Sequence, residues 1–127
     1  MSAVWIEYQP NPCGRSVGDC SVRAISAALG VDWETAYNIL ANAGFEMCDM
    51  PSANATISAV LRQSGFYKGS IPTAYPQNYT AEQFSKDHPK GIYVLFFGNH
   101  VATVIDGNIL DAWNSSREIP QYFWYLK

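Results

Sequence analysis

Three residues far apart in this sequence have the types needed for nucleophilic chemistry. Cys20 lies in the stretch VGDCSVRAIS, His100 opens the run HVATVI, and Asp111 lies in NILDAWN. A cysteine thiolate attacks carbonyl carbons, a histidine moves the proton, and a carboxylate orients the histidine ring and fixes its tautomer. If the fold brings them together, these residue types indicate acyl transfer by a Cys-His-Asp triad.

The sequence between His100 and Asp111 predicts how these two residues meet. Asp106-Gly107 separates two apolar runs, which is a strong signal for a β-hairpin with a two-residue turn. With that turn, Asp111 is the diagonal neighbour of His100 on one face of the hairpin. We expect its carboxylate to accept a hydrogen bond from the Nδ1–H of the imidazole. The alternative is a His-Asp pair with a purely structural role.

Cys20 lies at the predicted start of a helix. The stretch DCSVRAISAALG (19–30) has a helical apolar stripe, with Asp19 as the expected N-cap and Gly30 as the expected stop. The N-terminus of a helix carries partial positive charge, which stabilises a thiolate. A thiol paired there with a histidine is an activated nucleophile, whereas a cysteine buried as a small hydrophobe is the alternative.

The elements that must position these residues follow from the periodicity of the chain. Helices are predicted over 19–30, 32–44, 51–65 and 80–89, and strands over 3–9, 91–97, 100–105, 108–113 and 122–127. Helices that come first and strands that come last indicate an α+β fold with a mostly antiparallel sheet. A chain of 127 residues has room for a single domain, 1–127.

Composition disfavours several classes of function. The net charge is −3 with 8 Lys and Arg residues, and no basic run is present, so no nucleic-acid partner is expected. No stretch approaches the roughly 18 apolar residues of a membrane span. The segment MSAVWIEYQPNP lacks the basic start and apolar core of a signal peptide, so a cytoplasmic location is expected.

The cysteines predict neither a disulfide framework nor a metal site. Cys13, Cys20 and Cys48 are an odd, low number without an export signal, and none has the spacing of a zinc site. Cys13 lies in a loop without a helix start, and Cys48 is expected in a helix interface. The predicted chemistry therefore needs no metal and no organic cofactor.

The order of a helix-borne cysteine, a strand histidine and a nearby aspartate resembles that of papain-like cysteine peptidases. The stretches GDC, NHVATVI and DAWN carry the resemblance. Asp111 and Trp113 fall where the family has an Asn that orients the histidine and a Trp that shields it. Aspartate as the third member is similar to the bacteriocin-processing (C39-type) branch, and VGDCSVRAIS resembles small bacterial or phage members.

This resemblance implies a papain-like domain in which N-terminal helices pack on a C-terminal twisted antiparallel sheet. It implies a thiol peptidase or amidase that acts on a peptide or protein and transfers the acyl group to water. In papain, a glutamine six residues before the cysteine helps to bind the oxyanion, but Gly14 occupies that place here. One oxyanion donor is expected to be the backbone N–H of Cys20 at the helix start, and the second is expected from Asn11, which two prolines flank, or from Gln9.

Two other functions are consistent with the same residues. The triad could transfer an acyl group to an amine, as in a transglutaminase-like or acetyltransferase-like protein or an isopeptidase, and product analysis would separate these from a hydrolase. Alternatively, the chain could be a non-catalytic binding module that keeps the fold. Exposed aromatic residues near the cleft, among Tyr67, Tyr75 and Tyr79, would then bind the ligand.

Overall fold

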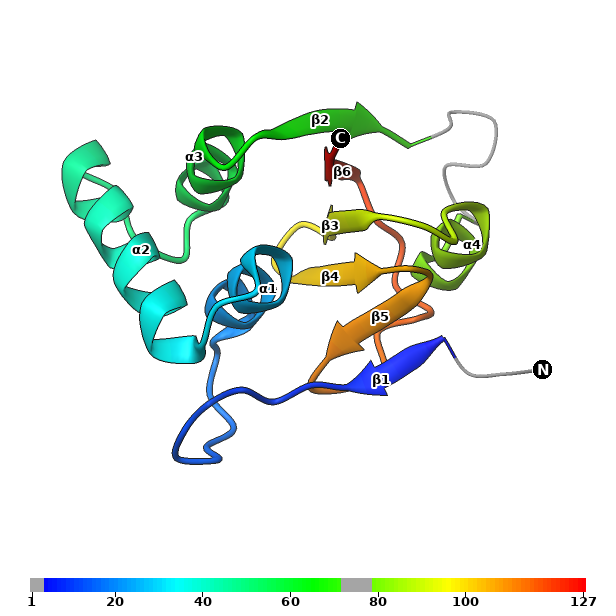
Figure 1. Ribbon diagram of the computed structural model, residues 1–127, viewed down its shortest axis with the longest axis horizontal. Coiled ribbons are helices and arrows are strands. Elements are labelled where there is room, and N and C mark those ends of the chain that lie inside the picture. Colours follow the sequence, from blue (N-terminus) through cyan, green and yellow to red (C-terminus); the bar gives the residue numbers. More distant parts are fainter. Residues whose placement is uncertain (1–3, 72–78) are drawn as a thin grey trace.

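The computed structural model describes residues 4–71 and 79–127 as an α+β fold. The helices are α1 (Cys20–Leu29), α2 (Trp33–Met47), α3 (Asn54–Gln63) and α4 (Ala81–Asp87). The strands are β1 (Trp5–Glu7), β2 (Phe66–Ser70), β3 (Ile92–Phe96), β4 (Val101–Ile105), β5 (Asn108–Asp111) and β6 (Tyr122–Leu126). All six strands form one sheet in the order β1-β5-β4-β3-β6-β2 (Figure 1).

The sheet is mixed. Strands β5, β4, β3, β6 and β2 pair antiparallel, which agrees with the predicted mostly antiparallel sheet, but β1 pairs parallel with β5 at one edge. The strand β2 at the other edge was not predicted, because FYKGS lacks a clear alternation of apolar and polar residues. Its pairing with β6, more than fifty residues away, makes it a strand. Contacts that are distant in sequence therefore determine both edges.

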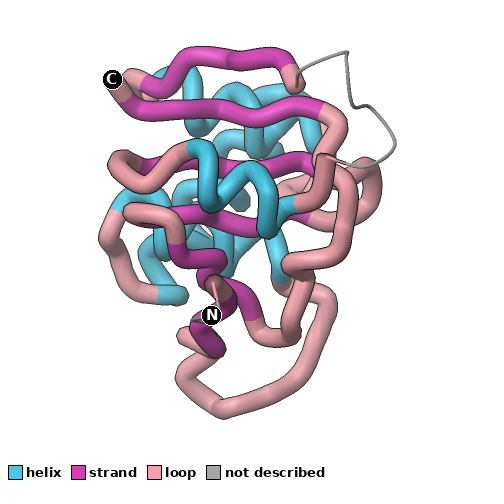
Figure 2. The backbone as a smooth tube through the Cα atoms, turned by 90° about the vertical axis from the view of Figure 1, so that its right-hand side faces the viewer, coloured by secondary structure: helices cyan, strands magenta, loops and turns pink. Residues whose placement is uncertain are grey.

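The helices cover the two faces of the sheet unequally. Figure 2 shows the strands between one short helix on the near side and the other helices behind them. Val94 and Phe96 pack in one apolar cluster with α1, α2 and α3, whereas Leu95 and Val104 pack in a second cluster with α4. This alternation is the period of two that a strand requires, and it explains why the central strands are apolar on both faces.

Helix α2 is longer than the sequence predicted. Its N-terminus begins at the expected cap, Asp32, but the chain passes through Gly44 and the helix ends at Met47. A Cβ atom at Gly44 would lie 2.9 Å from the backbone oxygen of Asp49, so this glycine serves close packing rather than termination. Cys48 is the C-cap in a left-handed conformation (φ 56°) and is exposed, so its predicted place in a helix interface is wrong.

The predicted hairpin turn is confirmed. Asp106 and Gly107 both have positive φ angles, 49° and 81°, as a type I′ turn requires. The strands that flank the turn pair with Ile105 opposite Asn108. This register brings the start of β4 and the end of β5 to the same end of the sheet, and α1 lies beside it (Figure 1).

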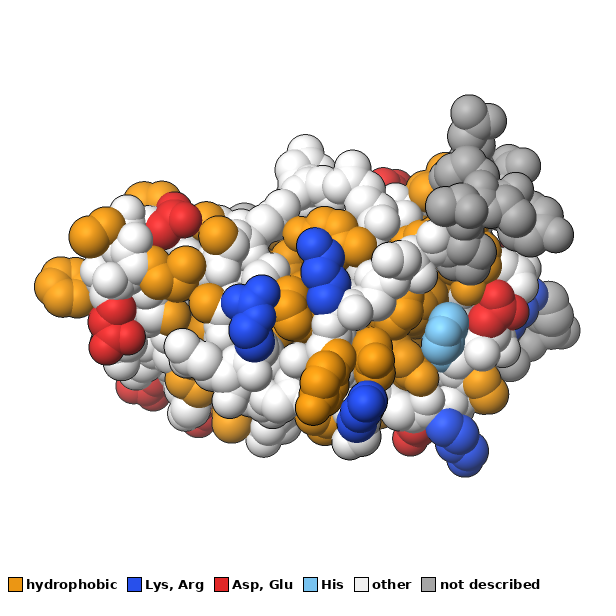
Figure 3. Space-filling model, turned by 90° about the horizontal axis from the view of Figure 1, so that it is seen from above, with side chains coloured by type: hydrophobic (Ala, Val, Ile, Leu, Met, Phe, Trp, Pro, Cys, Tyr) orange, Lys and Arg blue, Asp and Glu red, His pale blue; other side chains and the backbone are white. Residues whose placement is uncertain are grey.

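The described residues contain no helix that could span a membrane, and the face shown in Figure 3 has no continuous strip of basic side chains. None of the helices within residues 4–71 and 79–127 combines the length and apolar character needed to cross a membrane. Lysine and arginine side chains on the face shown in Figure 3 lie apart from one another among hydrophobic and uncharged atoms.

Candidate active site

Cys20 is the first residue of α1 and lies next to His100, at the end of the sheet where β4 begins. Burial raises the pKa of the Cys20 thiol, but three other influences outweigh burial. They are a hydrogen bond with His100, a hydrogen bond from the Val101 backbone, and the positive charges of His100 and Arg23. The net result is a pKa below the ordinary value of a thiol.

His100 connects this thiol to a buried carboxylate. Its Nε2 lies 2.7 Å from Oδ2 of Asp111. The predicted bond through Nδ1 is therefore wrong. The backbones of diagonal neighbours on two strands are roughly 7–8 Å apart. Nε2 reaches Asp111 across this distance because it is the ring nitrogen farther from the backbone of His100. Burial lowers the pKa of His100, but hydrogen bonds and charges from Asp111 and Cys20 raise it to about 9.

Asp111 ends β5 and is fully buried, with every carboxylate oxygen bonded. Oδ2 accepts hydrogen bonds from His100 and from the Ser115 hydroxyl, each at 2.7 Å. Oδ1 accepts the Ala112 N–H at 2.8 Å and is also bonded by Arg23. Burial raises the pKa of Asp111, but the bonds of His100 and Ser115 and the charges of His100 and Arg23 hold it below the ordinary value.

A buried arginine links Asp111 to the start of α1. Arg23 contacts Oδ1 of Asp111 through Nε at 3.2 Å and Nη2 at 3.1 Å, and its Nη1 contacts Oδ1 of Asp19 at 2.9 Å. The other oxygen of Asp19 accepts the indole N–H of Trp33 at 2.9 Å. Asp19 occupies the predicted N-cap position, but its side chain makes no capping bond because Arg23 and Trp33 engage it.

Two aromatic rings contact the His100 imidazole. The Trp113 ring lies 4.8 Å away between centroids, and the Phe97 ring lies 5.8 Å away in a stacked arrangement. Trp113 is 45% exposed, so its side chain meets both the imidazole and solvent. Trp113 and His100 therefore lie on the same side of the hairpin, as its register predicts.

The structure does not bring Gln9 or Asn11 into the hollow that contains the thiol. The Asn11 oxygen accepts the Cys13 N–H at 2.8 Å, and the Gln9 oxygen accepts the Asn11 N–H at 3.3 Å, so both amides shape the loop. Asn54 lines the hollow instead, and its Nδ2 donates to the Gly98 carbonyl at 3.1 Å. This hollow has a volume of about 450 Å³ and is lined by Gly18, Cys20, Ser52, Asn54, Ile57, Gly98, Asn99, His100 and Val101.

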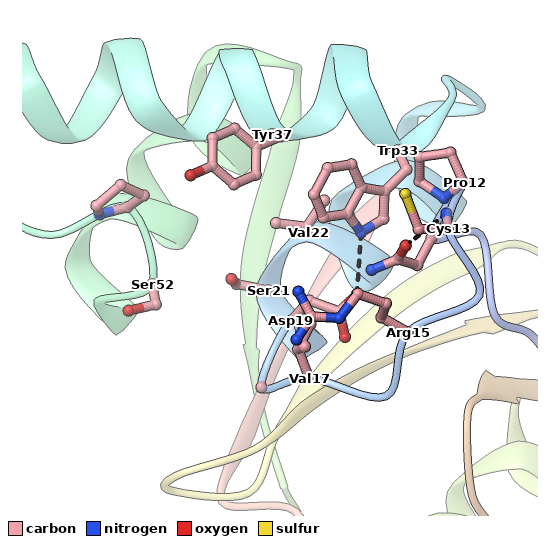
Figure 4. Close-up of a pocket in the computed structure, with 13 residues that line it drawn as sticks. Pro12, Cys13, Arg15, Val17, Asp19, Ser21, Val22, Trp33, Tyr37 and Ser52 are labelled. Atoms are coloured by element: carbon pink, nitrogen blue, oxygen red, sulfur yellow. Dashed lines mark hydrogen bonds between the residues drawn. The ribbon is translucent and has the colours of Figure 1, made fainter.

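A second pocket, largely apolar, adjoins this hollow. The two share Gly18 and Ser52, and the second pocket has a volume of about 430 Å³. Figure 4 shows the Trp33 and Tyr37 rings extending from α2 towards Val22 of α1, with the hydrogen bond from Trp33 to Asp19 dashed. Asn11 lines this second pocket. A ligand bound at Cys20 thus has an apolar surface within reach.

Three residues of the site were not predicted from sequence: Arg23, Ser115 and Asn54. Arg23 lies among the buried residues of α1, four positions after Asp19. The spacing of four residues between Asp19 and Arg23, which lets an acidic and a basic side chain pair on one helix face, was the signal in the sequence. Ser115 is fully buried four residues after Asp111, and no sequence pattern distinguishes it from other serines.

Tyr67 and Tyr79, two of the tyrosines considered for a binding module, do not line the hollow that contains Cys20. Tyr79 is only 4% exposed and donates its hydroxyl to Asp87 at 2.8 Å, so the prediction that it is exposed is wrong. Tyr67 is exposed on the edge strand β2 and lines a different hollow, beside Arg62 and Lys68. Tyr75 lies outside the described residues.

The described residues contain no group of three His, Cys, Asp or Glu side chains placed to hold a metal ion. No family model matches the chain, and neither a curated protein nor a solved structure matches it. The chemistry of the site therefore rests on its own geometry, which joins an acidic thiol, an imidazole and a buried carboxylate in one line of contacts.

Proposed function

We propose that this protein is a papain-like cysteine peptidase or amidase. Cys20 is the nucleophile, His100 is the general base and acid, and Asp111 orients His100. One observation carries the proposal: the helix-start thiol contacts an imidazole whose other nitrogen is bonded at 2.7 Å to a fully buried carboxylate. A merely structural His-Asp pair needs no thiol with a lowered pKa beside it.

The proposed mechanism depends on which ring nitrogen of His100 is not bonded to Asp111. Because Asp111 bonds Nε2, Nδ1 is the nitrogen that exchanges a proton with Cys20. The thiolate sulfur forms a bond to the substrate carbonyl carbon, and the imidazolium gives its proton to the departing amine. His100 then takes a proton from water, the resulting hydroxide attacks the thioester, and Cys20 leaves as the thiolate.

The oxyanion of each tetrahedral intermediate needs hydrogen-bond donors. The first N–H groups of a helix have no partner within the helix, so the backbone N–H of Cys20 at the start of α1 is one donor. Asn54 is the second, because it carries the side-chain amide of α3 that lines the same hollow as Cys20. One of its amide hydrogens is bonded to Gly98, and the other is available.

Selective alkylation tests the nucleophile. Cys13 and Cys48 are exposed, whereas Cys20 is partly buried, so accessibility alone predicts that Cys20 reacts slowest with iodoacetamide. A thiolate held by His100 predicts the opposite order at about pH 6, where ordinary thiols are protonated. Peptide mass spectrometry of partly labelled protein measures all three rates at once. If Cys20 reacts no faster than the other two, the proposal fails.

Product analysis then identifies the acyl acceptor. The protein is incubated with a mixture of short peptides, with and without added glycine amide, and the products are weighed by mass spectrometry. Hydrolysis gives free carboxylates in both samples, whereas a transferase gives amide adducts when the amine is present. Cys20→Ala removes the products in either case, and Cys48→Ala is the matched control.

A further inference from the structure

We propose that Arg23 is a positioning residue that holds Asp111 for His100, and that Asp19 moderates the effect of the Arg23 charge on the triad. This inference rests on the proposed function. The observation behind it is that one guanidinium, 5% exposed, bonds the triad carboxylate at 3.2 and 3.1 Å and a second buried carboxylate at 2.9 Å. Neither carboxylate is more than 5% exposed.

The geometry makes Arg23 a link between two separate elements. Arg23 and Cys20 lie one turn apart on α1, whereas Asp111 is at the end of β5, 88 residues from Arg23. Two nitrogens of the planar guanidinium contact Oδ1, which leaves Oδ2 to His100 and Ser115. Helix α1, which carries Cys20, therefore also fixes the Asp111 carboxylate that orients His100. The planar guanidinium of an arginine can make these several directed contacts, whereas a lysine ammonium would act as a point charge.

The charges around Arg23 explain the presence of Asp19. The groups that face this cluster are Asp19 and Cys20 on α1, Asp111 on β5 and His100 before β4. With Cys20 as the thiolate, the cluster holds three anions and two cations. Without Arg23, two carboxylates would be buried without a cationic partner between them, which is costly. Asp19 in turn neutralises part of the Arg23 charge that would otherwise draw more strongly on Asp111 and Cys20.

The test measures the rate of Cys20 alkylation by iodoacetamide at about pH 5.5, where ordinary thiols are protonated. Arg23→Gln should slow the reaction about tenfold, because the thiolate loses a cation and Asp111 loses the group that fixes it. Asp19→Asn should accelerate it about threefold, because the full Arg23 charge then acts on the triad. Damage to the fold would slow both variants, so opposite signs separate electrostatics from a structural role.

A double-variant cycle tests whether Arg23 acts through Asp111. In the Asp111→Ala background, Arg23→Gln should slow alkylation by less than about threefold. An equal loss in both backgrounds, or a slower Asp19→Asn protein, overturns the inference. If circular dichroism shows that Arg23→Gln does not fold, the alkylation rate of Asp19→Asn alone tests the inference. Asparagine has nearly the shape of aspartate, and this substitution leaves two anions and two cations in the cluster. The proposed function fails separately, if the unmodified protein shows no preference for Cys20 over Cys13 and Cys48.

Discussion

The two histidines of this chain lie in regions that resemble each other in packing and differ in charge. His88 ends α4, where its ring stacks on Phe84 with centroids 3.9 Å apart and its Nδ1 lies 2.8 Å from the Phe84 carbonyl oxygen. His100 also contacts aromatic rings, but it lies between the Cys20 thiol and the Asp111 carboxylate. Both imidazoles therefore contact aromatic rings, and within residues 4–71 and 79–127 only His100 forms an ion pair.

The difference shows what turns a packed histidine into one that can do chemistry. A carbonyl oxygen only accepts hydrogen bonds, so Nδ1 of His88 donates its hydrogen to the Phe84 carbonyl. This bond connects the ring to no ionisable group. At His100, the carboxylate favours the imidazolium and the imidazolium favours the thiolate, so each charge stabilises the next. Aromatic packing sets the position of a ring, and the ionised neighbours set its proton affinity.

The largest effect on turnover is predicted for replacement of His100, and it tests whether the two histidines differ in function. His100→Gln should reduce turnover about 10⁴-fold, because it removes the group that moves the proton. His88→Gln, which keeps an amide near the Phe84 carbonyl, should change turnover less than about twofold, since the hydrogen bond of His88 goes to a backbone carbonyl and not to a carboxylate. Peptide hydrolysis by the two variants is measured side by side. A large loss in both would mean that the two sites are not functionally distinct.

The carboxylates near the two histidines offer the next comparison. Asp111→Asn should slow turnover about 10³-fold, because the amide can present its NH₂ to the ring and favour the wrong tautomer. Asp87→Asn, which alters the carboxylate bonded by Tyr79 and Gln83 near the end of α4, should leave turnover unchanged.

Stability separates orientation from unfolding in these variants. Asp111→Asn should lower the free energy of unfolding by about 2 kcal/mol, less than the roughly 3–5 kcal/mol of an unpartnered buried charge, because Arg23 keeps Asp19. Urea unfolding monitored by fluorescence measures the free energy of unfolding of the Asp111→Asn and Asp87→Asn proteins. Full activity of a folded Asp111→Asn protein would show that another group orients His100.

The proposed oxyanion donors, Cys20 and Asn54, line the same hollow as His100, so replacing one of them tests the comparison further. Asn54→Ala should lower turnover about 10²-fold and leave iodoacetamide labelling of Cys20 unchanged, because alkylation forms no oxyanion. Asn11→Ala should change turnover less than about threefold, since its side-chain oxygen is bonded within the loop and it lines the neighbouring pocket. The reverse ranking of these two variants in a hydrolysis assay would restore Asn11 as the donor.

The smallest predicted effect is the pH dependence, about tenfold per pH unit outside the active range. The pKa of Cys20 lies below the ordinary value of a thiol, and the pKa of His100, about 9, keeps the imidazole protonated at neutral pH. Activity should therefore fall on the acid side as the thiolate gains a proton, and fall again as the pH passes about 9 and His100 loses one. An upper limb that His88→Gln moves would contradict the assignment to His100.

Local pattern explains the parts of the fold that the sequence by itself determined. The four helices, the strands β3 to β6, the two-residue turn after Ile105 and the position of Cys20 at a helix start were all predictable. Each depends on contacts or backbone preferences within a few residues, such as the positive φ angles of Asp106 and Gly107 or the apolar stripe of α1. The Cys-His-Asp set was predictable as residue types in order, and the hairpin register supplied the pairing of His100 with Asp111.

The tertiary structure alone decided how the site is supported and where its edges lie. No local pattern reveals that Arg23 of α1 reaches Asp111, that β1 adds to β5 in parallel, or that Gly44 lets a helix pass close to another segment. Burial decides these features, because a charge or a strand edge removed from water must find a partner wherever the fold provides one. That partner lies 88 residues away for Arg23 and Asp111, and the pairing appears only when helix and sheet pack together.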